Sequence, residues 1–360
     1  MKSYLNIIEP TLVSESGHCH SFIESLVNEY PNEKLIIWAD IKNQLEFKSQ
    51  HNAEVIVKQY FFRRIRKIQN IFLYNKLLKL PEKILISTAN RTDLLLLNLI
   101  SKNKIPKEKV FLFFHWINLN QKKIKQLKAV ATKQPNLVII APTETIAKSF
   151  TEAGFTNVKV IAYPITKSLQ KIENKVEFKA VSFIGAARAD KGFAAVVDLI
   201  AYAEKKNFEI PFSIQTSADH YGKYDPQTEA DILRLSKSNY PKLELIKLTL
   251  SKKEYLDSFA GTICLQLYNT KDFADRVSGV TLDALSSGTP IITTDDTWIA
   301  RQVSRFNAGI IIKSTSPSEV VLAINKIIEN YREYCKNATY AGQTLQKEHK
   351  AFNLVQLLTV

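Results

Sequence analysis

Residues 275–292 read DRVSGVTLDALSSGTPII, which predicts a helix, a turn and a strand in succession. Gly288 and Pro290 mark the end of the helix, because glycine is favoured just past a helix C-terminus and proline cannot continue the helix. The short apolar run that follows is typical of a parallel strand that is buried on both faces. Asp275 and Asp283 lie eight positions apart, just over two helical turns, so we expect both on roughly one helix face. The alternative is a solvated carboxylate pair.

A second informative stretch, residues 180–193, reads AVSFIGAARADKGF and predicts a strand, a turn and the start of a helix. Gly185 lets the backbone approach a ligand closely. Arg188 and Lys191 supply the charge that a diphosphate needs, and the N-terminus of the following helix adds a partial positive charge. The alternative is an ordinary exposed turn with two solvated cations.

The same alternation of short apolar runs and helical stretches continues along the 360 residues. It predicts two doubly wound α/β halves with an active site in the cleft between them, because ligands bind at the carboxyl ends of such strands. The predicted strands are 4–8, 35–39, 83–87, 110–115, 137–141 and 158–162 in the first half, and 180–184, 212–215, 243–246, 262–267, 290–293 and 309–312 in the second.

The predicted domain boundaries follow from this rhythm. Residues 1–166 form the first domain and residues 167–338 the second, and the lysine-rich stretch 167–179 is interpreted as a linker. Residues 339–360 have a helical composition, and we expect this C-terminal helix to pack back on the first domain.

The two motifs together resemble glycosyltransferase family 4, the glycosyl transferases group 1, which are retaining GT-B enzymes. That family carries a Gly-x-x-Arg-x-x-Lys-Gly turn and a Glu-x7-Glu motif that continues into Glu-Ala-x-x-x-Gly-x-Pro-x-Ile. Its counterparts here are the turn at 185–192 and the motif at 275–292. The chain departs from the family in having aspartate at both glutamate positions, and in having Arg276 and Ser278 where glycines are usual.

The resemblance implies a GT-B fold, two Rossmann-like domains that face a central cleft. It also implies transfer of a sugar from a nucleotide-diphosphate donor to an acceptor hydroxyl, with retention and without a metal or other cofactor. Because peripheral GT-B enzymes act on lipid-linked acceptors, we expect a role in cell-surface polysaccharide or glycolipid assembly. The aspartate replacements and Arg276 leave open a second possibility, a catalytically weak GT-B protein that binds nucleotide sugars or serves as an assembly partner.

The resemblance also assigns site residues. The first domain contributes Gly17, in the loop after the first strand, where GT-B enzymes place a glycine against the donor phosphates. The second domain contributes Gly185, Arg188 and Lys191 at the donor diphosphate, Asp283 at the ribose, Asp275 at the transferred sugar, and the backbone amides around Ser278, Gly279 and Val280 at the phosphate.

His115 ends the apolar stretch VFLFFHW at the carboxyl end of a predicted strand. A neutral imidazole there can hydrogen-bond a sugar hydroxyl or a developing charge, and family members often carry a histidine after this strand. We therefore include His115 among the catalytic candidates. The alternative is a satisfied core histidine beside Trp116.

The composition restricts partners and location. The formal net charge of +14 attracts nucleic acid, anionic lipid or phosphorylated small molecules, or reflects a lysine-rich proteome. Nucleic-acid binding is not expected, because no recognisable module accompanies the charge. Three cysteines without paired spacing favour a cytoplasmic protein, and we find neither a signal peptide nor an apolar run of about 20 residues.

Residues 58–80 read KQYFFRRIRKIQNIFLYNKLLKL, in which apolar and cationic side chains alternate and no acidic residue occurs. We interpret Lys58–Leu80 as a basic amphipathic helix that lies on an anionic membrane, with Phe61, Phe62, Ile65 and Ile68 inserted. The alternative is a helix packed on the sheet with its lysines snorkelling to water.

Overall fold

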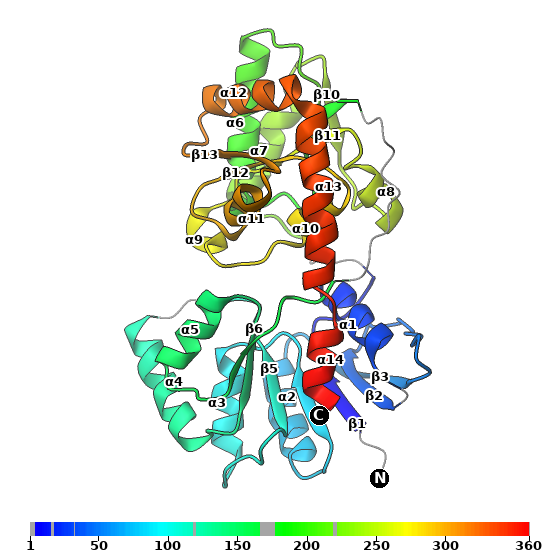
Figure 1. The fold of residues 1–360 in the computed structure, drawn as a ribbon, viewed down its shortest axis with the longest axis vertical. Helices are drawn as coiled ribbons and strands as arrows, with labels where there is room; N and C mark the ends of the chain where they lie inside the picture. The colour runs from blue at the N-terminus through cyan, green and yellow to red at the C-terminus, as the bar shows by residue number, and fades with distance from the viewer. Residues whose placement is uncertain are drawn as a thin grey trace. The chain divides into compact units, whose positions relative to one another are not determined.

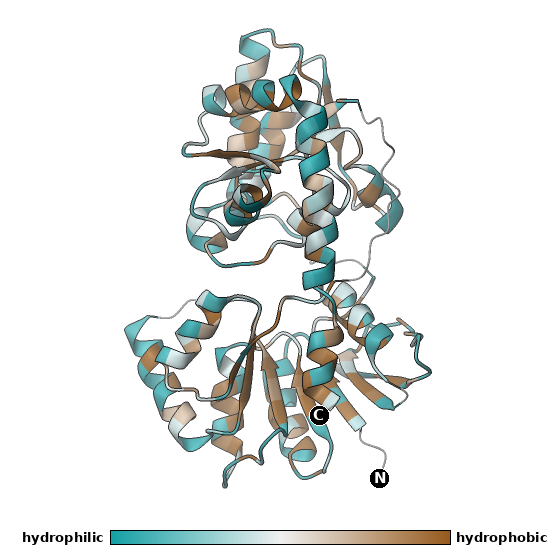
Figure 2. Cartoon of the chain, in the orientation of Figure 1, coloured by the Kyte–Doolittle hydropathy of each residue, from teal (hydrophilic) through white to brown (hydrophobic). Residues whose placement is uncertain are grey.

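The computed structural model describes residues 4–15, 18–31, 33–117, 120–165, 177–218 and 222–359. The chain divides into two compact units, Met1–Lys167 with His349–Val360, and Ser168–Glu348. Each unit contains one parallel β-sheet with helices packed against it; in Figure 1 the first unit is blue to green apart from the red C-terminal helix, and the second is green to red. Strand residues of both sheets are predominantly hydrophobic (Figure 2), as expected for parallel sheets covered on both faces.

The sheet of the first unit has the strand order β3-β2-β1-β4-β5-β6-β7. The order reverses between β1 and β4, so the loops after these two strands lie at the switch point where such sheets bind ligands. The strands are β1 Tyr4–Ile8, β2 Lys34–Asp40, β3 Glu54–Phe61, β4 Lys83–Ile86, β5 Val110–Phe113, β6 Val138–Ala141 and β7 Val158–Val160. The helices are α1 His18–Glu29, α2 Arg66–Leu77, α3 Arg91–Ile100, α4 Gln121–Lys133, α5 Glu144–Glu152 and the C-terminal α14 Phe352–Thr359.

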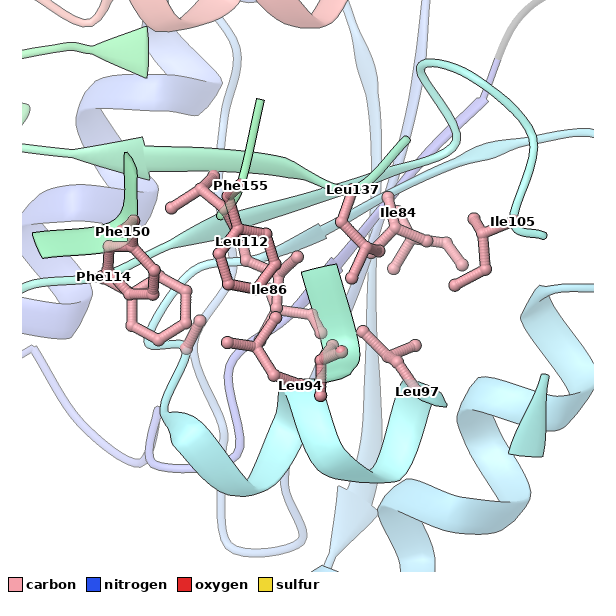
Figure 3. Close-up of a cluster of buried hydrophobic side chains, with 14 of the residues drawn as sticks. Ile84, Ile86, Leu94, Leu97, Ile105, Leu112, Phe114, Leu137, Phe150 and Phe155 are labelled. Carbon is pink, nitrogen blue, oxygen red and sulfur yellow. The ribbon is translucent and has the colours of Figure 1, made fainter. Parts of the chain in front are cut away.

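The core of the first unit lies between the sheet and its helices. Leu94 and Leu97 of α3 lie against Ile84 and Ile86 of β4 and Leu112 of β5 (Figure 3), and all are buried. The N-terminus of α3 is fixed by a capping box, which is the reciprocal pairing expected at a stable helix start.

The sheet of the second unit has the order β10-β9-β8-β11-β12-β13, with its switch point between β8 and β11. The turn after β8 therefore lies beside the carboxyl end of β11. The strands are β8 Ala180–Phe183, β9 Phe212–Gln215, β10 Leu243–Ile246, β11 Thr262–Gln266, β12 Ile291–Thr294 and β13 Gly309–Ile312. The helices are the 3-10 helix η1 Ala189–Lys191, α6 Phe193–Lys205, α7 Pro226–Ser236, α8 Lys252–Asp257, α9 Thr270–Phe273, α10 Gly279–Ser286, α11 Trp298–Phe306, α12 Pro317–Glu329 and α13 Tyr331–Glu348.

Two of the predicted element and domain boundaries are wrong in the structure. Lys58–Leu80 is not one helix, because its first residues complete strand β3 and the helix begins only at Arg66. The boundary predicted after residue 338 falls within α13, and the second unit continues to Glu348. Most of the predicted linker at 167–179 lies outside the described residues.

The C-terminal helix α14 belongs to the first unit. The Nζ atom of Lys83 donates a hydrogen bond of 2.9 Å to the carbonyl of Leu358. The backbone amide of Ile165 donates to the carbonyl of His349 at 3.1 Å, which joins the segment before α14 to the same unit.

Within the second unit, α13 packs closely against α10. The contact passes through Gly342, where an added Cβ atom would lie 2.3 Å from the carbonyl oxygen of Leu285. Only glycine therefore allows this approach, and α13 braces the helix that carries Asp283.

We expect Gly342→Ala to lower the stability of the second unit by roughly 1–3 kcal/mol, because the methyl group must push the two helix backbones apart. Chemical denaturation followed by circular dichroism measures the loss. Lys336→Ala, on the exposed face of the same helix, is the control and should change stability little. Equal stability of the Gly342 variant and the control would contradict the packing described.

Candidate functional site

The turn after β8 is held against β11 by a glycine. Gly192 has a φ of +71°, and a Cβ atom placed on it would lie 1.9 Å from the carbonyl oxygen of Leu267. The amide of Asn269 also donates a hydrogen bond of 2.9 Å to the carbonyl of Asp190. The 3-10 helix that carries Lys191 is therefore fixed beside the segment that leads to α10.

Gly185 brings the amine of Lys191 to the first turn of α10. Gly185 has a φ of +100°, and a Cβ atom on it would lie 2.9 Å from Nζ of Lys191 and 3.5 Å from Cγ2 of Val280. The predicted phosphate-binding turn and the predicted phosphate-binding helix are thus neighbours within one unit. A side chain at position 185 would displace the amine.

The N-terminus of α10 is free to receive an anion. Ser278 caps the helix, and its side chain accepts a hydrogen bond of 3.3 Å from the amide of Thr281. The amides of Gly279 and Val280 lie in the first turn, where a helix provides no intrahelical acceptor. Nothing lies within 4 Å of a Cβ atom built on Gly279, so this turn faces open space. Such a terminus is a ready anion site.

A second arginine joins the predicted pair of cations. One oxygen of Asp190, Oδ2, accepts a hydrogen bond from Nη2 of Arg188 and lies 3.4 Å from Nη1 of Arg276. Its other oxygen, Oδ1, is buried and accepts no hydrogen bond from the described residues. Two guanidinium groups therefore contact one carboxylate, and Asp190 also acts on the charge of the neighbouring Lys191.

This crowding changes the protonation of the lysine. Burial and the like charges of Arg188 and Arg276 together lower the pKa of Lys191 to about 8, and Asp190 opposes the shift. Burial and the neighbouring Arg188 also lower the pKa of Arg276. Positive charges that repel one another in the unliganded site would be stabilised by an anion.

A pocket of about 430 Å³ opens beside the same turn. It is lined by Ala187, Arg188, Ala189, Asp190, Lys223, Tyr224 and Asp225. Tyr224 donates a hydrogen bond of 2.7 Å to the carbonyl of Thr216, which holds one wall in place. Arg188 and Asp190 thus lie at the edge of a space that can hold part of a ligand.

Asp283 lies on α10, as predicted, and already has a partner. The hydroxyl of Tyr255 donates a hydrogen bond of 2.9 Å to Oδ2 of Asp283. Burial raises the pKa of this carboxyl to about 6, and the Tyr255 hydrogen bond and the charge of Lys252 oppose the rise. Tyr255 itself stays protonated, because burial and Asp283 raise its pKa well above the usual value.

Asp275 is not on the helix, and the prediction that it shares a helix face with Asp283 is wrong. Asp275 lies in the loop between α9 and α10, because the helix begins only at Gly279. Its Oδ1 accepts a hydrogen bond of 2.9 Å from Arg301, whose guanidinium also donates to the carbonyl of Ala274. The predicted contact between Asp275 and a sugar stays a prediction.

The first-unit candidates have a different setting. His115 follows β5, and its Nε2 lies 2.8 Å from the carbonyl oxygen of Ser87. A carbonyl only accepts, so Nε2 carries a proton. The ring packs between Phe22 and Tyr163, with centroids 5.9 and 4.9 Å away. These contacts are those of a packed histidine, and its role toward a sugar stays a prediction. Gly17 lies outside the described residues.

Sequence reasoning missed several polar partners that hold the site. Gln215 accepts a hydrogen bond of 2.7 Å from the amide of Gly185, and Gln266 accepts one of 2.6 Å from the hydroxyl of Thr281. Both glutamines stand at the carboxyl ends of strands β9 and β11, where a polar residue closes an apolar run. A glutamine at the carboxyl end of a predicted strand was the sequence signal from which these two partners could have been found.

Asp283→Asn offers a pH test of the buried carboxyl. The pKa of about 6 in the folded protein lies above the usual 3.8, so protonation contributes stability that is present below pH 3.8 and is lost as the pH rises through 6. Asparagine does not titrate, so we expect the melting temperature of the variant to exceed that of the wild type more at pH 7.5 than at pH 4. Thermal melts at both pH values measure this difference.

The control for this comparison is Asp257→Asn, an exposed substitution on α8. Its effect on the melting temperature should be the same at both pH values. A pH-independent effect of Asp283→Asn would show that the carboxyl ionises in the folded protein as it does in the unfolded chain.

Comparisons with known proteins find a family segment and similar folds. Residues 253–344 match the family described as glycosyl transferases group 1. A search of curated protein sequences finds no match. HepE of Anabaena, solved with UDP and glucose, superposes with a TM-score of 0.65 at 14% identity, over 99% of this chain and 98% of that one.

Two further solved structures are similar over their whole lengths. Sucrose-phosphate synthase of Thermosynechococcus elongatus has a TM-score of 0.68 at 11% identity, with 99% of this chain and 98% of that chain covered. WaaG, a glycosyltransferase involved in lipopolysaccharide biosynthesis, has a TM-score of 0.66 at 11% identity, with 99% of each chain covered. The predicted fold class is confirmed: the chain is a GT-B protein that resembles the group 1 glycosyltransferases and carries that family's segment over residues 253–344.

Proposed function

We propose that the protein is a glycosyltransferase that moves a sugar from a nucleotide-diphosphate sugar to an acceptor hydroxyl. The observation that carries this proposal is the convergence of Arg188, Lys191 and the open N-terminus of α10 in one unit. Cations and free amides together suit a diphosphate. The group 1 segment and the UDP-bound structure of HepE support the same donor class.

The proposed reaction retains the anomeric configuration. The bond between the anomeric carbon and the diphosphate oxygen breaks, a bond to the acceptor oxygen forms on the same face, and the acceptor proton passes to the leaving phosphate. The leaving group then carries the developing negative charge, and Arg188, Lys191 and the amides of Gly279 and Val280 stabilise it. This proposal includes no metal cofactor, because these groups supply the charge neutralisation.

We place the reaction in the assembly of a cell-surface polysaccharide or glycolipid, in the cytoplasm at the inner face of the membrane. WaaG, which has the same fold, takes part in lipopolysaccharide biosynthesis. The acceptor in this proposal is a lipid-linked or polymeric sugar.

A second candidate is a catalytically weak protein that binds nucleotide sugars or serves as an assembly partner. It is favoured by Asp275, whose carboxylate is paired with Arg301 at 2.9 Å. Calorimetric titration with UDP, GDP and ADP distinguishes a pure assembly role, which predicts no binding, from nucleotide recognition. The activity assay then separates an enzyme from a binding protein.

The activity assay incubates the protein with UDP-, GDP- and ADP-sugars and an acceptor-containing lysate. Release of a nucleoside diphosphate from one donor, dependent on the acceptor, supports the proposal, and the anomeric proton of the product reports retention. If no donor releases nucleotide, transferase activity is contradicted.

We expect Arg188→Ala and Lys191→Ala each to reduce turnover by about 30- to 1000-fold, equivalent to roughly 2–4 kcal/mol of transition-state stabilisation. The reason is that each cation contacts charge that develops as the phosphate leaves. Steady-state kinetics with the active donor measures the loss. Arg234→Ala, which removes an exposed arginine paired with Asp198 on the surface of the second unit, is the control and should leave turnover near normal. Near-normal turnover of both test variants would contradict the assignment of Arg188 and Lys191 to the donor diphosphate.

We further propose that the first unit docks on an anionic membrane. Four large apolar side chains near α2 are about half exposed or more: Phe62 49%, Ile65 47%, Ile68 56% and Phe72 66%. These four side chains fall within eleven residues of the chain, and exposed apolar surface that gathers in one place marks a binding site. Phe61, which we had placed in this stripe, is fully buried, and Phe72 takes its place.

The charge near this stripe favours a lipid surface. Arg63, Arg64 and Lys67 are exposed between the apolar residues, and no acidic residue occurs from Lys58 to Leu80. Ile68 and Phe72 are four residues apart on α2 and so share a face. Apolar residues flanked by cations suit shallow insertion among acidic headgroups. None of the helices in the described parts of the chain combines the length and apolarity needed to cross a bilayer.

Changing Arg63, Arg64, Arg66 and Lys67 to glutamine should abolish sedimentation with phosphatidylglycerol vesicles, because each cation near the surface contributes about 1 kcal/mol. High salt should weaken the wild type similarly, since the screening length is about 10 Å at 0.1 M. Nucleotide binding should be unchanged. The matched control makes the same change to glutamine at four exposed lysines of the same unit, Lys102, Lys104, Lys107 and Lys125. This variant should still sediment with the vesicles. Equal loss in both variants would show that net charge, not this surface, drives binding.

A further inference from the structure

Arg276 is one of the residues at which this chain departs from the pattern of the group 1 enzymes, which usually have glycine there. It lies in the loop between α9 and α10, two residues before the capping Ser278. Its guanidinium carbon lies 4.9 Å from the ring centroid of Phe273, and its Nη1 lies 3.4 Å from Oδ2 of Asp190. Contacts on both sides therefore hold the side chain against the cationic turn.

We propose that Arg276 is a third cation for the donor diphosphate, added by this chain to Arg188 and Lys191. This inference rests on the proposed function, because it assumes a nucleotide-diphosphate donor. It assigns to Arg276 direct binding of a phosphate oxygen, together with the amides at the start of α10.

The positions of the neighbouring groups support this assignment. Asp190 contacts Arg276 and Arg188 through one oxygen, so the two guanidinium groups lie close to each other. The amine of Lys191 lies close to Gly185 and Val280, at the first turn of α10. Arg276 lies three residues before Gly279, the first residue of that turn. Phosphate bound at the turn would thus be within the reach of a long side chain whose fork of donors suits phosphate oxygens.

The balance of charge supports it too. Arg188, Lys191 and Arg276 are three cations, whereas Asp190 pairs with both arginines and Asp272 offsets charge only at Arg276, so positive charge is in excess. A bound diphosphate with about two negative charges would neutralise this excess. If the only role of Arg276 were to pair with Asp190, it would duplicate the ion pair that Arg188 already makes.

The test compares Arg276→Gly, Arg276→Lys and the wild type by calorimetric titration. The probes are UDP, GDP and ADP, then the monophosphate and nucleoside of whichever binds the wild type. We expect Arg276→Gly to weaken the diphosphate roughly 10- to 100-fold, as for a lost hydrogen bond to a charged group, and to leave the nucleoside unchanged. Arg276→Lys keeps the positive charge but lacks the forked donors of arginine. Its affinity for the diphosphate should lie between those of Arg276→Gly and the wild type.

Proton linkage provides a second readout. The groups that face the Lys191 amine are Arg188, Asp190, Arg276, Cys264 and the Tyr268 ring. Because the pKa of Lys191 is about 8, we expect the wild type to take up protons when the diphosphate binds at pH 8.5. In Arg276→Gly, Lys191 loses one repelling neighbour and starts with a higher pKa, so fewer protons should be taken up. Titrations in buffers of different ionisation enthalpy measure this number.

The outcomes separate this inference from the proposed function. If no nucleoside diphosphate binds the wild type, the proposed function fails and the inference fails with it. If one binds and Arg276→Gly has the same affinity and proton uptake, only the inference is overturned. Equal weakening of diphosphate and nucleoside would show a merely structural role. If Arg276→Gly binds the diphosphate with unchanged affinity but binds a uronate sugar donor such as UDP-glucuronate more weakly, Arg276 contacts the sugar instead. This outcome would also overturn the inference.

Discussion

The close approach of Gly192 to the carbonyl of Leu267 is the constraint on which the candidate site depends. Any side chain at this position would collide with the backbone that leads out of β11, where a Cβ atom would lie 1.9 Å from the oxygen. Because this contact is possible, the 3-10 helix lies against the segment before α10. The cations of one βα unit and the helix N-terminus of another are thereby brought to the same place, although some ninety residues separate them in the chain.

The charges of the neighbouring side chains explain why the turn after β8 favours a bound anion. Burial and the like charges of Arg188 and Arg276 lower the pKa of Lys191, burial and Arg188 lower the pKa of Arg276, and Asp190 opposes both shifts. One oxygen of Asp190 accepts no hydrogen bond from the described residues, so the cations are not all paired with this carboxylate. A bound diphosphate would replace mutual repulsion with attraction. One turn along the same helix, Tyr255 holds Asp283, and burial raises the pKa of that carboxyl.

Much of the fold could be predicted from the sequence, because strands buried on both faces read as short apolar runs. The strand β3 was missed for the opposite reason. It lies at the edge of its sheet, most of its residues are half-buried or exposed, and its sequence EVIVKQYF runs into the cationic stretch that favoured a helix. Phe61 and Phe62 are chemically alike, yet one is buried and the other exposed, since only tertiary structure decides where β3 ends.

The site divides in the same way. Arg188, Lys191 and Asp283 were found because their spacing follows a known pattern, and the structure brings the first two to the helix that carries the third. The partners of the carboxylates were not predictable, because Tyr255 and Arg301 come from other elements at separations that no motif records. Asp275 was misplaced because eight residues match two helical turns only if the helix has begun, and here Ser278 begins it.

The most direct test of this account is a crystal structure of the protein with a bound nucleotide sugar, or with UDP, GDP or ADP. The account predicts the diphosphate between the side chains of Arg188 and Lys191 and the amides of Gly279 and Val280, with the ribose at Asp283. A nucleotide bound elsewhere, with these groups still facing solvent, would contradict it.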